Sequence, residues 1–487
     1  AYGKFARVVL GTNDIDFRAR PHSDEETAFL IEHVVATGPQ GGAVTYADLE
    51  HAKTVLLVGF EPEEESPIVF LRLRKAFRRT KTVVYAVAPM PTRGLTKVGG
   101  SLIPAAPGQE AAQLRDLRSS EVGGAALDAL DEDGIILVGE RLATSPGALA
   151  AAADLAAATG ARLAWVPRRA GERGALETGA LADLLPGGRP VADVAARGEV
   201  AAVWEVNALP GTPGRDTTGI IAAAAAGDLD ALVVGGLDPA DLPGSLAGAA
   251  GEALEKAFIV SLELRESAVT AAADVVLPVA SQSEKPGSYV NWEGRVREFE
   301  EALVSNAVSD HRALDMLAGE MGHFLETRTV REIRDQFEVL GPWSGARGLP
   351  GSTAAAAAAP SHPLSALPSG PGDLVLATWA TLLDAGRMQD GEPFLAGTAP
   401  ATLARLSPAS AARLRVGDGD LVTVTATAQP LGRVTAPVAV TAGMIDGVIW
   451  LPTNAKDCKV RAGLGAEAGD RVSVTPVSAT STGGVAR

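Results

Sequence analysis

Residues 54–88, TVLLVGFEPEEESPIVFLRLRKAFRRTKTVVYAVA, decide the fold of the first part of the chain. The continuous apolar run at 54–60 is typical of a strand that is covered on both faces, and residues 61–65 are expected to form a loop. A helix begins at Pro67, because proline suits the first helical position, and a second apolar strand follows at 82–88. A strand, a helix and a strand in this order predict one unit of a parallel sheet.

The same alternation recurs further along the chain. It predicts strands at 134–139, 162–166, 231–235, 258–262 and 275–279, and helices at 146–159 and 313–339. Strands that alternate with helices predict the α/β class, with parallel sheets flanked by helices.

The character of the sequence changes after residue 340. Residues 341–372 are rich in alanine and proline and are expected to be a linker. Residues 373–487 alternate apolar and small polar residues between turn signals, as at 432–440, a pattern that predicts a β-rich domain closed into a barrel. The predicted organisation is an α/β region at 1–340 with two subdomains, the linker, and the barrel domain.

The composition of the chain argues against several classes of function. The chain has 59 acidic and 43 basic residues and a net charge of −16, which argues against a nucleic-acid binder. Its single cysteine, Cys458, excludes an intrachain disulfide and a four-thiolate cluster, and we expect this lone thiol to be inert. The uncharged stretches are too short or too rich in proline to span a bilayer, so we expect no membrane insertion. The chain starts at Ala1 without methionine, and we expect it to be part of a longer protein.

Two turns lie where a parallel sheet would bind a nucleotide phosphate, at the carboxyl ends of strands. The first contains Glu61 and three further glutamates that would repel a pyrophosphate, and the second contains Asp238. Neither has the glycine pattern of a dinucleotide fingerprint. A structural turn with an acidic surface is the favoured interpretation, and a nucleotide site is the alternative.

The helix after residue 66 carries six cations, Arg72, Arg74, Lys75, Arg78, Arg79 and Lys81. One interpretation is a solvated face that the preceding glutamates neutralise. The other is a docking surface for an acidic partner subunit. The sequence does not decide between them.

Residues 274–300, DVVLPVASQSEKPGSYVNWEGRVREFE, place Asn291, Glu293 and Arg295 after a buried strand. Polar side chains there suit a ligand site, and a loop that fixes packing is the alternative.

At the start of the chain, Ser23 is expected to cap a helix, with Glu26 closing the capping box. The histidines show no metal-ligand or catalytic-triad spacing, so we expect neither catalytic residues nor a metal site.

Three segments together resemble the molybdopterin oxidoreductase family. They are residues 10–22 (LGTNDIDFRARPH), 273–295 (ADVVLPVASQSEKPGSYVNWEGR) and 409–420 (ASAARLRVGDGD), in the order that the family has them. The form YVNWEGR at 289–295 is most similar to the branch that serves as the large peripheral-arm subunit of respiratory complex I, and the alanine-rich composition suggests its actinobacterial form.

The resemblance implies an inherited fold without its cofactor. Active members place a cysteine, selenocysteine or serine metal ligand two residues after the arginine that corresponds to Arg20, and this chain has His22 there. Imidazole cannot supply an anionic thiolate. We therefore expect no cofactor in this chain, and iron–sulfur clusters of the 2Fe-2S and 4Fe-4S types in a preceding part of the subunit. The residues expected to line the degenerate cleft are His22, Glu61, Asp238, Asn291, Glu293 and Arg295.

The function that the resemblance implies is a structural and interaction module of the electron-transfer arm of proton-translocating NADH-quinone oxidoreductase. Such a module is non-catalytic by itself, packs against other peripheral-arm subunits, and lies at the cytoplasmic face of the cell membrane. Two alternatives stay open. One is an active molybdenum or tungsten bis-pterin oxidoreductase of the formate dehydrogenase type, and the other is an independent nucleotide-binding protein.

Overall fold

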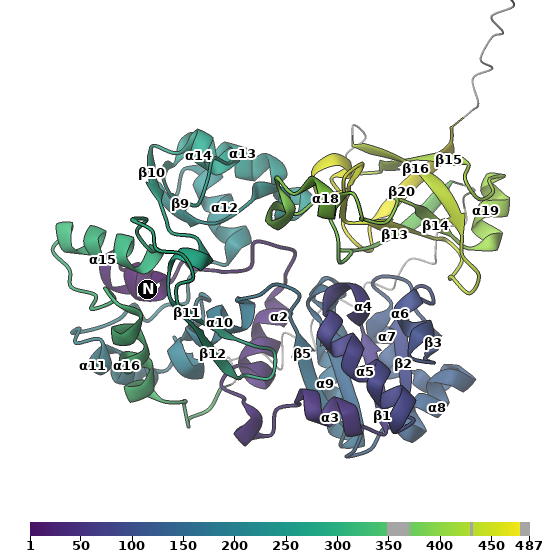
Figure 1. Ribbon diagram of the computed structural model, residues 1–487, viewed down its shortest axis with the longest axis horizontal. Helices are drawn as coiled ribbons and strands as arrows, with labels where there is room; N and C mark the ends of the chain where they lie inside the picture. Colours follow the sequence, from purple (N-terminus) through teal and green to yellow (C-terminus); the bar gives the residue numbers. More distant parts are fainter. Residues whose placement is uncertain (348–369, 371, 429–431, 478–487) are drawn as a thin grey trace, which may run out of the picture. The chain divides into compact units, whose positions relative to one another are not determined.

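The computed structural model describes residues 1–347, 370, 372–428 and 432–477 (Figure 1). Two compact units form within the chain. The first contains Ala1–Leu49, Ile135–Ala143 and Arg162–Ala359, and the second contains Glu50–Gly134, Thr144–Ala161 and Pro360–Arg487. Most of the predicted linker at 341–372 lies outside the described residues.

The first five strands belong to one sheet in the order β3-β2-β1-β4-β5. Strands β1 and β2, β2 and β3, and β4 and β5 pair in parallel, with Thr54 opposite Val83 and Ile135 opposite Arg162. Every residue of β1 and β4 is buried, as the continuous apolar runs predicted. The strands are β1 (Thr54–Val58), β2 (Val83–Ala88), β3 (Ser101–Pro104), β4 (Ile135–Gly139) and β5 (Arg162–Val166).

Helices flank this sheet, and the α/β class is confirmed (Figure 1). The segment expected to be a loop after β1 is instead a helical turn, α4 (Pro62–Glu65), because Pro62 sits at its first position and Glu61 caps it. The other helices of this part are α3 (Tyr46–His51), α5 (Pro67–Arg79), α6 (Arg93–Lys97), α7 (Glu110–Arg115), α8 (Glu121–Ala129) and α9 (Ala148–Thr159).

A second parallel sheet has the order β10-β9-β8 and lies in the first unit. Small side chains such as Ala224 and Ala253 pack helices closely against Ile259 on one face. An antiparallel hairpin of β11 and β12 follows it in the chain. The elements are α12 (Thr217–Ala226), β8 (Ala231–Gly235), α13 (Ala247–Lys256), β9 (Phe258–Glu263), α14 (Ala268–Ala272), β10 (Val275–Pro278), β11 (Gly287–Val290) and β12 (Val296–Phe299).

The single helix predicted at 313–339 is wrong, because the chain forms two helices there. The first, α15 (Asp310–Glu320), stops before Gly322, which has a φ of +82°. The second, α16 (Val330–Leu340), begins at Thr329 with a capping box closed by Glu332.

Among the helices of the described residues, none combines the length and apolarity needed to cross a membrane. The remaining helices of the first unit are α1 (Tyr2–Lys4), α2 (Asp24–Phe29), α10 (Glu172–Glu177) and α11 (Val194–Val203).

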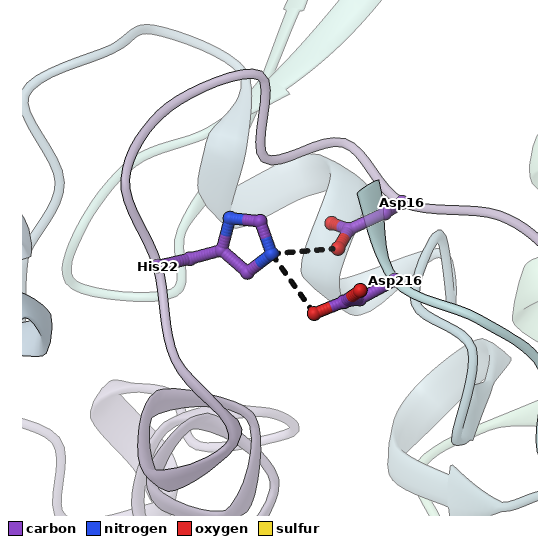
Figure 2. Close-up of side chains that lie close together, drawn as sticks. All are labelled: Asp16, His22 and Asp216. Atoms are coloured by element: carbon purple, nitrogen blue, oxygen red, sulfur yellow. Dashed lines mark hydrogen bonds and ion pairs between the residues drawn. The ribbon is translucent and has the colours of Figure 1, made fainter. Parts of the chain in front are cut away.

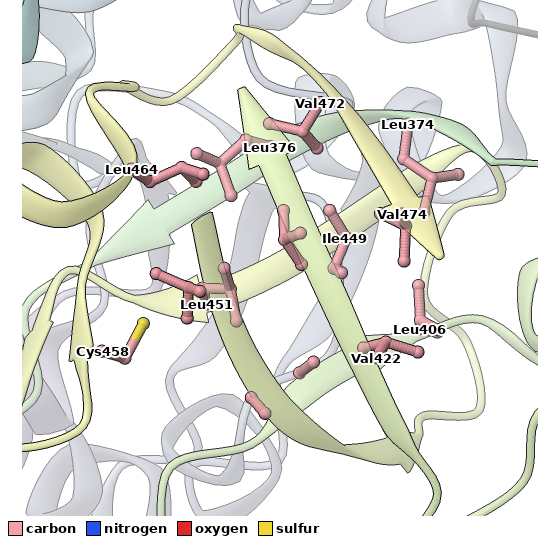
Figure 3. Close-up of a cluster of buried hydrophobic side chains, with 14 of the residues drawn as sticks. Leu374, Leu376, Leu406, Val422, Ile449, Leu451, Cys458, Leu464, Val472 and Val474 are labelled. Atoms are coloured by element: carbon pink, nitrogen blue, oxygen red, sulfur yellow. The ribbon is translucent and has the colours of Figure 1, made fainter. Parts of the chain in front are cut away.

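The C-terminal part is a closed barrel in the order β13-β17-β14-β16-β15-β20. Alternate residues of β15 point inward, and the core is built from leucine, valine, isoleucine and alanine (Figure 3). Cys458 is fully buried in this core, where burial raises the pKa of its thiol to about 12 and disfavours the reactive thiolate. The barrel strands are β13 (Asp373–Trp379), β14 (Ala404–Leu406), β15 (Leu421–Ala426), β16 (Arg433–Val440), β17 (Val448–Pro452) and β20 (Arg471–Pro476), with α18 (Pro393–Ala396) and α19 (Pro408–Leu414) between them.

Candidate functional site

Two buried arginines organise the segment that leads into α2. The Arg18 guanidinium donates to Asp16 at 2.8 Å and to the Thr27 hydroxyl at 2.8 Å. The Arg20 guanidinium donates to Glu26 at 2.9 Å and to Glu172 at 2.9 Å. Both arginines are at most 2% exposed, so these cations depend on their carboxylate partners.

More carboxylates than cations surround Arg20. Glu140 lies 3.7 Å from its Nε, in addition to Glu26 and Glu172. Burial, helped by the charges of Glu140 and Glu26, outweighs the attraction of Arg20 and raises the pKa of Glu172 to about 7. Burial also opposes ionisation of Glu140, but Arg20 and the neighbouring cations at 168 and 169 lower the pKa of that carboxyl.

Only one of the two capping interactions predicted for α2 forms. Ser23 accepts from the backbone N–H of Glu26 at 3.2 Å, so the N-cap is confirmed. The Glu26 side chain does not serve as the expected capping-box partner, because its carboxylate accepts from Arg20 and Arg18 instead. A buried guanidinium without a partner costs more than a lost capping bond. The need to pair the buried arginines therefore outweighs the capping-box interaction that the sequence predicted for Glu26.

His22 lies between two aspartates from distant parts of the first unit (Figure 2). Its Nε2 is 3.0 Å from Asp216 Oδ2 and 3.9 Å from Asp16 Oδ2, and its Nδ1 is 2.8 Å from the carbonyl oxygen of Arg20. Both ring nitrogens therefore face hydrogen-bond acceptors, because a carbonyl oxygen and a carboxylate only accept. The hydrogen bond from His22 holds the pKa of Asp216 down at about 2.

The His22 cluster has the composition of a metal site but the bonding of an ion-pair cluster. Asp16, His22 and Asp216 offer ligand atoms within 4.8 Å of one another, and they form the one such group found among the described residues. Asp16 already accepts from Arg18 and from the backbone N–H of Thr217, and Asp216 also caps α12. Sequence reasoning missed this cluster, since the only local signal at Asp216 was that of a helix cap.

Asn291, Glu293 and Arg295 come together in the turn between β11 and β12. Asn291 Nδ2 donates to Glu293 Oε2 at 2.8 Å, and Arg295 donates to the same oxygen at 3.1 Å. The second oxygen of Glu293 accepts from the Tyr46 backbone N–H at 2.6 Å, and Glu293 is only 3% exposed. A Cβ on Gly294 would lie 2.2 Å from the Thr37 carbonyl oxygen. These contacts favour the alternative interpretation of this segment, a loop that fixes packing.

The two remaining candidates, Glu61 and Asp238, lie in different units. Glu61, in the second unit, caps α4 and is 5% exposed, and its backbone N–H donates to Glu65 at 2.5 Å. The expected acidic surface is therefore partly wrong, because Glu61 and Glu65 are both buried. Asp238, in the first unit, accepts from the Ala240 N–H at 3.0 Å in a short turn. Both carboxylates cap local structure.

A cavity of about 640 Å³ opens in the second unit beside the barrel. Arg405 stacks over the ring of Trp450 in its wall, and burial lowers the pKa of the Arg405 guanidinium. The indole N–H of Trp450 and the Oε1 of Gln389, both on this wall, lack hydrogen-bond partners among the described residues. Sequence reasoning did not identify this cavity, which is lined mainly by residues between 381 and 405 and is completed by residues near 450–457 and by Glu64.

Comparison with known families agrees with this architecture. A model described as molybdopterin oxidoreductase matches residues 16–309, and one described as molydopterin dinucleotide binding domain matches residues 375–484. The first match spans both parallel sheets and all six candidate cleft residues. The chain therefore belongs to the molybdopterin oxidoreductase family, and the resemblance seen in its three motifs is confirmed.

Within this family, two relatives that match along almost the whole chain carry the same name. The G subunit of NADH-quinone oxidoreductase from Mycobacterium bovis is 52% identical over 480 residues, which cover 97% of this chain and 57% of that protein. Its counterpart of the same name from Streptomyces coelicolor is 49% identical, covering 98% of this chain and 58% of that protein. The chain thus spans a little over half the length of these curated relatives.

More distant relatives share parts of the sequence or the fold alone. Formate dehydrogenase H of Escherichia coli is 29% identical over 174 residues, covering 35% of this chain and 24% of that protein. The solved structure of acetylene hydratase from Pelobacter acetylenicus aligns with a TM-score of 0.52 at 14% identity, covering 93% of this chain and 81% of that chain. The latter likeness supports the fold and nothing further.

Proposed function

We propose that this chain is a structural and interaction module of the peripheral electron-transfer arm of a proton-translocating NADH-quinone oxidoreductase. In this proposal the ancestral pterin and metal site is no longer used, and no residue of the chain is catalytic. The module packs against other peripheral-arm subunits at the cytoplasmic face of the membrane. The 2Fe-2S and 4Fe-4S clusters belong to a preceding part of the same subunit.

The observation that carries the proposal is the bonding of His22. In the family motif this is the position of the metal ligand, which must present a free lone pair to the metal. Here one ring nitrogen faces the Asp216 carboxylate at 3.0 Å and the other faces a backbone carbonyl at 2.8 Å. The ring is only 1% exposed, so it has no room to turn outward. These residues do not fit a pterin-bound metal.

The names of the relatives support the proposed place of this chain in an NADH-quinone oxidoreductase. The proteins that match 97–98% of the chain are named as the G subunit of NADH-quinone oxidoreductase, whereas the named formate dehydrogenase matches only 35% of it. A module that inherited a cofactor fold and lost the cofactor keeps a large, rigid surface. Such a surface suits the positioning of neighbouring redox subunits.

The decisive experiment measures metal and cofactor in the native assembly. The chain would be tagged within its full-length subunit, produced in its own host and purified without detergent exchange. Molybdenum and tungsten would be quantified by mass spectrometry, pterin by fluorescence after oxidation, and NADH-quinone oxidoreductase activity in the same preparation. We expect co-purifying activity and metal far below one atom per chain.

A formate dehydrogenase produced in the same cells controls for metal supply. If that enzyme is loaded while the tagged subunit carries no molybdenum or tungsten, the loss of the site is supported. Stoichiometric molybdenum or tungsten with released pterin would establish the rival function, an active bis-pterin oxidoreductase. A preparation that lacks both the cofactor and the oxidoreductase activity would overturn the assignment to complex I.

A further inference from the structure

The outward face of α5 combines cations and aliphatic side chains. The helix buries Val69, Phe70, Leu73 and Ala76, which repeat at the spacing of one face. Ile68 and Leu71 point the other way and are 51% and 52% exposed. Arg74, Arg78 and Arg79 are exposed further along the helix, and exposed Lys81 follows it. We call Ile68, Leu71, Arg74, Arg78, Arg79 and Lys81 the α5 outer face.

The structure divides the six cations of this segment into two groups. Glu50, near the end of α3, forms ion pairs with both Arg72 and Lys75. The glutamates before the helix do not neutralise it as the sequence suggested, since Glu63 pairs with Arg93 at 3.1 Å and with Lys97. The four cations of the α5 outer face have no ion pair within the part of the chain that the structure describes.

The aliphatic pair gives this charged face the composition of a protein contact. Leu71 lies one turn before Arg74 and Lys75, so its side chain is flanked by cationic ones. Exposed arginines next to exposed aliphatic side chains are typical of protein interfaces, in which arginine is enriched. Helix α5 has 13 residues and is therefore about 20 Å long, enough for one side of a small contact.

We propose that the α5 outer face docks an acidic protein surface on a neighbouring subunit of the assembly. This inference rests on the proposed function, which supplies the assembly. Charge complementarity selects the partner: four unpaired cations toward the C-terminal end of the helix attract carboxylates, and Ile68 and Leu71, nearer its N-terminal end, are buried beside them.

A polyanion such as nucleic acid or an anionic membrane fits this face less well. The chain as a whole has a net charge of −16, which repels an extended polyanion beyond the reach of one helix. Ile68 and Leu71 would also lie against charged phosphates, where their burial gains little. A protein surface with carboxylates beside an apolar patch satisfies both parts of the face.

Charge reversal in the native complex tests the inference. The full-length subunit would carry Arg74→Glu with Arg78→Glu, and its incorporation into the oxidoreductase complex would be measured by native electrophoresis at about 50 and about 300 mM salt, a range over which screening changes strongly. The matched control is Arg433→Glu with Arg471→Glu, which makes the same change in net charge at exposed positions of the barrel in the same unit. We expect about a tenfold loss of incorporation for the α5 variant and none for the control.

A photo-crosslinking residue in place of Leu71 identifies what covers the face. A crosslink to an acidic peptide of another subunit, together with the loss on charge reversal, supports the inference. Crosslinks to lipid or nucleic acid, or equal incorporation of both double variants, would overturn it while leaving the proposed function intact. If the unmodified subunit itself fails to co-purify with oxidoreductase activity, the proposed function fails instead. A thermal melt of each variant separates lost docking from lost folding.

Discussion

The ion cluster at residues 16–26 and the core of the barrel are both buried, but their contacts are of opposite kinds. Around Arg18 and Arg20 the interior consists of guanidinium groups held by carboxylates at 2.8–2.9 Å. Inside the barrel it consists of leucine, valine, isoleucine and alanine side chains that are at most a few per cent exposed. The structure of the first region depends on ion pairs between matched charges. The structure of the barrel core depends on the close packing of apolar side chains that alternate along the strands.

The two kinds of interior differ in how they respond to the loss of one side chain. A buried charge that loses its partner remains desolvated and uncompensated, so the cost does not scale with the volume removed. An apolar core that loses methyl groups is destabilised mainly by the lost burial and by the cavity. The comparison therefore predicts different outcomes for substitutions in the two regions.

The largest effect is expected at Arg20. Arg20→Leu keeps the bulk of the side chain but leaves Glu26 and Glu172 without their shared cation. We expect a loss of about 3–5 kcal/mol in the stability of the first unit. Urea denaturation, with hydrogen exchange of peptides from α2 and α10, measures that loss where it arises.

Arg118→Leu is the matched control for this prediction. Arg118 and Asp128 also form a short ion pair, at 2.6 Å, but each side chain is 63% exposed. Removing an exposed pair costs less than about 1 kcal/mol. Equal losses at Arg20 and Arg118 would show that burial does not set the strength of the cluster, and the contrast between the two regions would disappear.

In the barrel, Leu451→Ala provides the apolar counterpart. Leu451 is fully buried, so its truncation is expected to cost about 2–5 kcal/mol through lost burial and a cavity. Leu421→Ala removes the same atoms from a side chain that is 46% exposed, and a loss of less than half that size is expected. Hydrogen exchange of peptides from β15 and β17 in urea measures the stability loss of each variant. A larger loss at Leu421 than at Leu451 would contradict the inward alternation of the barrel.

The same contrast explains which features could be predicted from the sequence. Alternating or continuous apolar runs are local, and they located β5 and β8 at their observed bounds and placed β16 within one residue. The bond between His22 and Asp216 joins residues 194 positions apart, and no local pattern encodes it. Glu26 was misassigned for the same reason, because its real partners are two arginines whose burial is a property of the folded unit.

The break between α15 and α16 was missed although a local signal marks it. The segment 313–339 was expected to be one helix, whereas the chain forms two. The Thr329–Glu332 capping box was present in the sequence as a start signal, but the expectation of one helix did not take it into account. The fold class was therefore predictable from the sequence, whereas the bonding of the candidate site required the folded chain.

The smallest effect is expected at Asp216, where the charge can be removed without removing the helix cap. Asp216→Asn retains a side-chain oxygen for the Gly219 N–H at the start of α12 but takes away the carboxylate that faces His22. The pKa of Asp216 is lowered to about 2 in the folded state from an ordinary value of 3.8, so its charge stabilises the fold above about pH 4. We expect Asp216→Asn to cost about 1–2 kcal/mol at about pH 6.

This contribution is lost as the pH falls, because the carboxylate takes up a proton when the pH passes through about 2. The difference in urea midpoint between the wild-type chain and Asp216→Asn should therefore be constant from about pH 6 to about pH 4 and shrink below that. Asp446→Asn, at a hydrogen bond to Ser407 in the barrel unit, serves as a carboxylate control with no histidine partner. A difference for Asp216→Asn that stays constant down to about pH 2.5 would show that the interaction with His22 is not electrostatic, and that this cluster behaves like the apolar barrel core.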